Sequence, residues 1–179
     1  MSEPRRPWSV PLRVGDVPDD GLRIEIEADE ATRVAVARVA GLDAVLRLEA
    51  AFDIAHHGRG GLHVQGRVAA TVGQTCVVSL EPVTNDIVEP VDLVFRPASR
   101  IAAGPGPAAL ELDPEAREAA EALVDGGIDL GAIATEFLIL GIDPYPRKEG
   151  AVFELPQGPE TEGGPFAALA ALKRSGSKD

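Results

Sequence analysis

The sequence predicts an α+β domain whose main element is a curled antiparallel β-sheet, barrel-like or sandwich-like in form. Apolar and polar residues alternate through most of the first hundred positions, a glycine-rich turn joins two of the alternating runs, and only a few short stretches have helical spacing. The chain has 179 residues, 45% of them hydrophobic and 4% aromatic, so we expect one domain with an aliphatic core. We place this domain at residues 1–155, followed by a flexible linker and a short helix at residues 156–179.

The first predicted elements are a strand and a helix. Residues Leu22 to Glu27 alternate between apolar and charged side chains, which is typical of a strand with one face on a core. Asp29 is a suitable N-cap for a helix over residues 30–40. Gly41 is a suitable end for this helix, because glycine readily adopts the left-handed conformation that closes helices.

A long β-hairpin is expected next, around the turn HHGRGG at residues 56–61. The residues predicted to face the core are Leu46, Leu48, Ala50, Phe52 and Ile54 in the first strand, and Leu62, Val64, Val68, Ala70 and Val72 in the second. Further strands are predicted from Cys76 to Leu80 and from Ile87 to Arg96. Pro90 should stand at a bulge or a sheet edge, because proline cannot donate a hydrogen bond to a neighbouring strand.

Between residues 98 and 127 the sequence leaves alternatives open. Residues 98–112 contain breakers and no amphipathic period, which predicts a surface loop or linker. Residues 115–123 are compatible with a helix, whereas residues 122–124 are equally compatible with a short strand before the turn at residues 125–127.

A helix that begins after Asp129 is better defined. Asp129 is its expected N-cap, and Pro144 and Pro146 forbid its continuation. The apolar stripe predicted for this helix consists of Leu130, Ile133, Phe137 and Leu140.

The C-terminal residues have a separate pattern. Residues 156–165 form a polar linker, after which Phe166, Leu169 and Leu172 fall on one side of a short helix that ends near Lys173. A helix this short is marginal alone in water, so we expect its apolar side to dock on the protein's own body or on a partner.

Composition limits the class of protein. A single cysteine, Cys76, excludes an internal disulfide and a multi-cysteine zinc site within one chain, and a buried structural thiol is expected there. No signal-peptide pattern and no run of ~18 apolar residues is present, so we expect a cytoplasmic protein without a membrane partner. The net charge of −12 gives no general attraction to nucleic-acid phosphates, and DNA is not an expected partner.

No arrangement of side chains predicts a catalytic site, a metal or a cofactor. His56, His57 and His63 surround one turn, but adjacent strand residues face opposite sides and no further ligand stands at a suitable spacing. Asp129 and Glu136 lie nearly on one face of their helix and form the strongest carboxylate pair. Such a pair could hold a metal or a proton, but we favour structural roles, in which the Asp caps the helix and the Glu bonds to a nearby backbone or basic group.

Three blocks carry a resemblance to a known family. The first is CVVSL at residues 76–80, which matches a Cys-x-x-Cys-Leu pattern at Cys76 and Leu80, with Ser79 in place of the second cysteine. The second block comprises Ile128, Asp129, Leu130, Glu136, Leu138, Leu140, Pro144 and Pro146, and the third runs from Gly164 to Lys173, with Gly164 in place of an asparagine. In these blocks the chain resembles the YceD-like family, the large ribosomal RNA subunit accumulation proteins.

The resemblance implies a non-enzymatic role in the synthesis, processing or stability of 23S ribosomal RNA, and hence in ribosome biogenesis and large-subunit assembly. The implied partner is ribosomal RNA or a ribosome-assembly protein, and no cofactor is implied. The alternative is a metal- or nucleotide-dependent enzyme that uses Asp129, Glu136 and the histidines.

Two surfaces are candidates for partner contact. Residues 31–80 hold five arginines against three acidic residues. Arg59 lies in the predicted turn, and His63, Gln65 and Arg67 share one side of the next strand, so this is the best local candidate for touching RNA phosphates; a solvated strand face is the competing interpretation. The second candidate is the tail, with Phe166, Leu169, Leu172 and Lys173.

Overall fold

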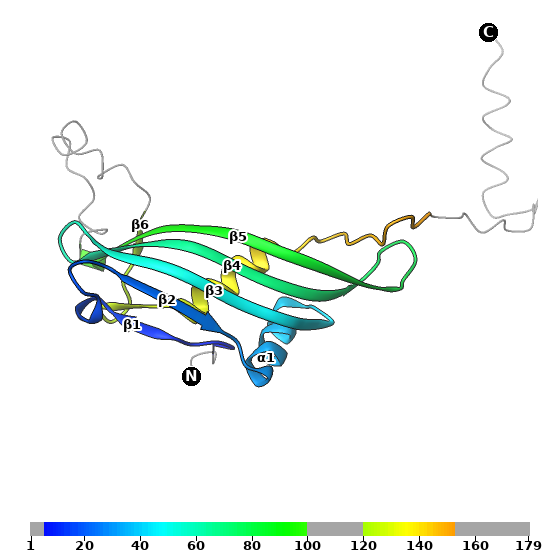
Figure 1. Cartoon of the computed structure of the whole chain (residues 1–179), viewed down its shortest axis with the longest axis horizontal. Helices are drawn as coiled ribbons and strands as arrows, with labels where there is room; N and C mark the ends of the chain where they lie inside the picture. The colour runs from blue at the N-terminus through cyan, green and yellow to red at the C-terminus, as the bar shows by residue number, and fades with distance from the viewer. Residues whose placement is uncertain (1–5, 100–119, 153–179) are drawn as a thin grey trace, which may run out of the picture.

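Three long strands and one helix that crosses them dominate the structure, a computed structural model that describes residues 6–99 and 120–152 (Figure 1). The main sheet has five strands in the order β2-β3-β4-β5-β6, and β1 and β7 form a second, two-stranded sheet. The strands are β1 (Pro11–Arg13), β2 (Leu22–Glu27), β3 (Ala44–His57), β4 (Gly61–Thr75), β5 (Pro82–Arg96), β6 (Ala120–Ala122) and β7 (Gly127–Asp129). The helices are the 3-10 turn η1 (Val14–Asp16), α1 (Glu30–Ala40) and α4 (Leu130–Leu140).

The predicted α+β class with a mainly antiparallel sheet is confirmed. Strands β2 to β5 pair antiparallel, and only β6 joins β5 in parallel. The sheet is open, because β2 and β6 stand at its two ends and do not pair with each other. Strands β3, β4 and β5 each follow their neighbour directly along the chain, so two hairpins form most of the sheet.

The hairpin predicted around the histidines is present, with β3 and β4 paired from Ala44↔Gly73 to His57↔Gly61. Its turn uses Gly58 and Gly60 at φ 54° and 77°, a left-handed conformation that glycine adopts without a Cβ penalty. One inward assignment is wrong. The register shifts between Val45 and Arg47, so Val45 is buried and Leu46 is 56% exposed.

Helix α1 begins and ends as predicted. The Asp29 carboxylate accepts the Thr32 N–H at 2.8 Å, and Gly41 closes the helix at φ 68°. Val36 and Ala37 point into the core.

The segment from Cys76 to Leu80 is a turn rather than the predicted strand. The Leu80 N–H donates to the Cys76 carbonyl at 3.0 Å, and Leu80 adopts φ 60°. Strand β5 begins at Pro82, earlier than the predicted Ile87, and ends at Arg96 as predicted. At Pro90 its pairing with β4 continues without a shift, while β6 pairs only with Val94–Arg96, so Pro90 stands at a sheet edge and not at a bulge.

The sequence left open whether a helix over residues 115–123 or a short strand over residues 122–124 precedes the turn, and residues 120–123 decide part of this question. They contain strand β6 and no helix, and Val124 forms a bridge with Gly127 across the turn. The other predictions for residues 100–119 lie outside the described residues.

Helix α4 lies on one face of the main sheet and contributes to the principal hydrophobic core. Leu130 and Leu138 are fully buried, and Ile133 is 6% exposed. Leu140 is predicted to share this stripe, but it is 69% exposed, because it lies with Ala132 and Glu136 on a side of α4 that the sheet does not cover. The core also includes Trp8 from the N-terminal segment.

Candidate functional site

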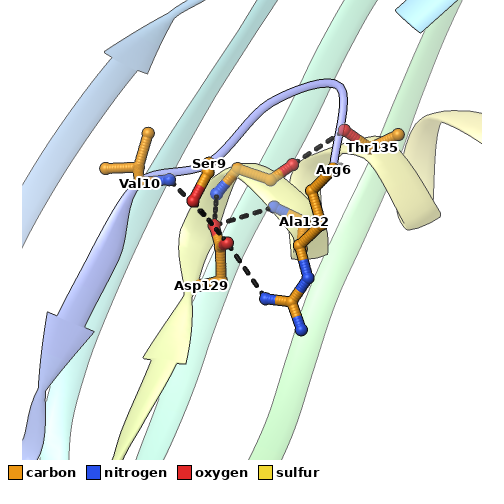
Figure 2. A network of polar contacts seen from close by, with 7 residues as sticks. Arg6, Ser9, Val10, Asp129, Ala132 and Thr135 are labelled. Atoms are coloured by element: carbon orange, nitrogen blue, oxygen red, sulfur yellow. Dashed lines mark hydrogen bonds and ion pairs between the residues drawn. The ribbon is translucent and has the colours of Figure 1, made fainter. Parts of the chain in front are cut away.

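A polar network centred on Asp129 joins the N-terminal segment to the start of α4 (Figure 2). One carboxylate oxygen, Oδ1, accepts the backbone N–H of Val10 at 2.8 Å, of Gly131 at 3.1 Å and of Ala132 at 3.2 Å. The other, Oδ2, accepts the Ser9 hydroxyl at 2.8 Å and the Arg6 guanidinium at 3.0 Å. We call this network the Asp129 junction.

The Asp129 junction is an ionised structural clamp. Burial raises the pKa of Asp129, but the hydrogen bonds from Val10, Ser9, Arg6 and Ala132 outweigh burial and hold the pKa below its ordinary value. The neighbouring backbone supports the clamp, since Leu12 pairs with Ile128 between β1 and β7. With five donors on one carboxylate, Asp129 is committed to holding the chain together, as the capping interpretation predicted.

Glu136 forms no hydrogen bond with the residues of the Asp129 junction. It lines a cavity of about 480 Å³ that also includes Glu121 and Asp129 and lies beside β1, β6, β7 and α4. Burial, and second the nearby charge of Glu136, raise the pKa of Glu121. Glu136 therefore acts electrostatically on Glu121.

The Cys76 turn is a second ordered polar centre. Its buried Sγ accepts N–H groups from Val78 at 3.4 Å, Ser79 at 3.3 Å and Lys148 at 3.3 Å. The Lys148 N–H and then the Ser79 hydroxyl and N–H lower the pKa of the thiol to about 6, against the effect of burial. The predicted buried thiol is confirmed, and its hydrogen bonds attach the chain after α4 to the β4–β5 turn.

The proline block shares this attachment. The Val77 N–H donates to the Pro146 carbonyl at 2.9 Å, and the Lys148 ammonium lies 3.0 Å from the Glu81 carboxylate. Leu80, by contrast, is 75% exposed in its left-handed turn position. The segments that contain the family-motif residues Cys76 and Pro146 are thus hydrogen-bonded to each other, while Asp129 and Leu130 lie at the other end of α4.

The outer face is our name for the side of β2 to β5 that points away from α4. His63, Gln65 and Arg67 lie there, as their alternation predicted. His63 Nε2 lies 2.7 Å from the Asp92 carboxylate, and Gln65 donates to the same carboxylate at 3.3 Å. The hydrogen bond with His63 lowers the pKa of Asp92. His63 therefore already has a carboxylate partner on the outer face.

The two arginines predicted to contact RNA, Arg59 and Arg67, differ in their surroundings. Arg67 borders a shallow hollow of about 280 Å³ together with Glu25, Glu27 and Glu49. Arg59 is exposed in the turn between β3 and β4. Carboxylates therefore accompany Arg67 and His63, whereas Arg59 extends beyond the strands.

The residues of the enzyme alternative are not gathered into a metal site in the structure. His56 Nε2 lies 2.9 Å from the Val17 carbonyl, and the rings of His57 and His63 are 6.0 Å apart in an edge-on arrangement. Across residues 6–99 and 120–152, no group of three or more His, Cys, Asp or Glu side chains could hold a metal ion. Phe166, Leu169, Leu172 and Lys173 lie outside the described residues.

Sequence reasoning missed the distant halves of both polar centres. Arg6 and Ser9 reach Asp129 from 123 and 120 positions away, and Lys148 reaches Cys76 from 72 positions away. The N-cap signal at Asp129 identified the local part of its network, but nothing in the spacing of the chain indicates which remote segment donates the rest.

A family model for "Large ribosomal RNA subunit accumulation protein YceD" matches residues 64–173, more than half of the chain. The chain belongs to this family. The match includes most of β4, together with β5, the Cys76 turn and α4, and so covers all three blocks on which the resemblance was based. Neither the curated proteins nor the solved structures contain a match. In the part of the chain that the structure describes, no helix is both long and apolar enough to cross a membrane.

Proposed function

We propose that this chain is a non-enzymatic cytoplasmic factor that supports the synthesis, processing or stability of 23S ribosomal RNA and thereby large-subunit assembly. The family match over residues 64–173 carries the proposal, because the family is described by the accumulation of large-subunit ribosomal RNA. The polar centres are consistent with a binding role. Asp129 and Cys76, the best chemical candidates, use their polar atoms to hold backbone segments in place.

Charge favours a protein of the assembling subunit as the main partner. The chain carries a net charge of −12, and on the outer face Asp92 already occupies His63 while three glutamates surround the hollow beside Arg67. A surface of this kind gains little from counterion release on RNA, whereas it attracts basic polypeptides. Direct RNA contact would then be local, through Arg59 and Arg67.

Deleting the gene tests the function. Mature 23S ribosomal RNA should fall relative to 16S, and particles lighter than the mature large subunit should accumulate in sucrose gradients. Expression of the full chain from a plasmid should restore both. An unchanged ratio during slow growth and in the cold would refute the proposal.

Recovery of the tagged protein from lysate, with and without ribonuclease, tests the partner. A protein partner remains bound after ribonuclease treatment and is identified by mass spectrometry. An association that disappears completely with ribonuclease would show that RNA is the main contact.

A further inference from the structure

Helix α4 is apolar on nearly all sides, although the sheet covers only one of them. Of its eleven residues, LGAIATEFLIL, only Thr135 and Glu136 have polar side chains. The Thr135 hydroxyl donates to the Gly131 carbonyl at 2.8 Å, which satisfies it within the helix. A helix that is apolar all round is normally covered on all sides, so the side of α4 away from the sheet calls for a second layer.

The uncovered side of α4 forms a groove. Its helical residues recur at the spacing of a single helix face, and the N-terminal segment borders it along one edge. The groove has a volume of about 260 Å³ and is lined by Arg6, Pro7, Ala132, Thr135, Glu136, Ile139 and Leu140. Ile139 is 40% exposed and Leu140 is 69% exposed, so large apolar side chains lie open to solvent here.

One end of this groove is acidic. Arg6, Ala132 and Glu136 line both the groove and the 480 Å³ cavity that contains Glu121, so the two hollows are adjacent. Within the described residues, neither Glu121 nor Glu136 forms an ion pair, and Arg6 is already bound to Asp129. A suitable occupant therefore combines an apolar stripe with a basic end.

The chain contains such a segment. We propose that residues 166–174 dock as a helix in the α4 groove, with Phe166, Leu169 and Leu172 on Ile139 and Leu140 and with Lys173 and Arg174 towards Glu136 and Glu121. Thirteen residues, 153–165, separate this segment from the last described residue, Val152. As a Gly- and Pro-containing linker they span roughly 20 Å on average and at most about 45 Å. The inference concerns the architecture of the chain and does not depend on the ribosomal role.

Cysteine cross-linking in the full chain tests this docking. Leu140→Cys is combined with Ala170→Cys, which keeps the three apolar residues of the tail, and the purified protein is mildly oxidised at micromolar concentration. The matched control combines Ala170→Cys with Val88→Cys. Val88 is 64% exposed, comparable to Leu140, but lies on the outer face. The native Cys76 is buried and serves in both proteins as a common background.

We call the variant with Leu140→Cys and Ala170→Cys the Leu140 pair, and the variant with Val88→Cys and Ala170→Cys the Val88 pair. Docking predicts that the Leu140 pair forms a disulfide within one chain at least several times faster than the Val88 pair. Equal rates for the two pairs, or no disulfide in either, would overturn the proposal. A disulfide between two chains in the Leu140 pair would also overturn it, because a second copy would then supply the occupant of the groove.

A charge swap provides a second readout in the same cross-linking assay. Glu136→Lys should slow the Leu140 pair severalfold, and adding Lys173→Glu should restore much of the rate. Glu25→Lys on the outer face is the control and should leave the rate unchanged. If Glu136→Lys and Glu25→Lys have the same effect, the acidic end of the groove does not recognise the tail. These rates are measured on purified protein, so their outcome is separate from ribosomal RNA levels.

Discussion

Replacing Asp129 with alanine removes the acceptor of five hydrogen bonds in one step. Loss of an N-cap acceptor costs ~0.5–2 kcal/mol. A part-buried backbone N–H left without a partner, here that of Val10, adds ~1–3 kcal/mol. The Arg6 side chain is 54% exposed, so its ion pair adds ~1 kcal/mol at most. The expected loss of unfolding free energy is therefore about 2–5 kcal/mol, and the Tm should fall by roughly 5–15 °C.

Urea and thermal denaturation of Asp129→Ala and Asp29→Ala measure this loss. Asp29 is the matched control because it also caps a helix, but its hydrogen bonds come from Thr32, three positions further along the chain. Amide hydrogen exchange at Val10 should accelerate in the Asp129 variant alone. Equal destabilisation of the two variants, with Val10 unaffected, would show that the remote donors contribute nothing and would refute the clamp.

The pH dependence of this clamp follows from the same carboxylate. Because the pKa of Asp129 is lowered in the folded chain, its contribution to stability is fully present above the unfolded pKa of ~3.9 and is lost as the pH falls through the lower folded value. The stability difference between the native chain and Asp129→Ala should therefore be constant near neutral pH and shrink in acid.

Three further predictions concern other parts of the fold. The thiolate absorbance of Cys76, the chain's one cysteine, should rise with a midpoint near pH 6, and stability should increase from there towards the unfolded thiol pKa of ~8.5, since a lowered pKa favours the folded thiolate. Gly131→Ala should destabilise by about 1–3 kcal/mol in urea denaturation, because a Cβ there would lie 2.9 Å from the Trp8 carbonyl carbon. Arg59→Glu with Arg67→Glu should reduce recovery of ribosomal RNA with the tagged protein severalfold, without lowering the Tm.

Each of these predictions has a control. A thiol midpoint at pH 8.5 or above would contradict the hydrogen-bond pattern at Cys76. Gly15→Ala should be nearly neutral, because a Cβ there meets nothing within 4 Å. A comparable loss of stability in both glycine variants would show that the close approach of Trp8 to Gly131 is not the cause. Arg23→Glu with Arg47→Glu makes the same charge change at two other exposed arginines of the outer face. If it reduces RNA recovery equally, the effect comes from total charge.

Local signals predicted the elements whose determinants are local. Asp29 and Gly41 define α1 through a side-chain cap and a left-handed residue, and both act within a few positions. The hairpin of β3 and β4 followed from period-two alternation and the glycines of its turn. The inward assignment failed at Leu46 because a one-residue register shift exchanges the two faces of a strand.

Features that depend on distant segments could not be read from the sequence. The apolar run after Cys76 resembles a strand, but hydrogen bonds from residues 78, 79 and 148 to its sulfur hold it as a turn. For the candidate site, the capping role of Asp129 was predictable, whereas its contacts with Arg6 and Ser9 depend on how β1 and β7 meet. Leu140 was misplaced because the helical period groups residues on one side of a helix but does not show how far around the helix the sheet's cover extends.

The pairing of β1 with β7 also determines when the fold can be completed during synthesis. The Val10 N–H and its acceptor Asp129 are 119 positions apart, so the N-terminal segment emerges long before its partner exists. At a translation rate of ~5–20 residues per second, roughly 6–24 seconds separate the two. The hairpins of β3, β4 and β5 are contiguous and have their partners much sooner. During this interval Trp8 lacks the α4 residues with which it shares the finished core, so the N-terminal segment reaches its native position only after α4 has been made.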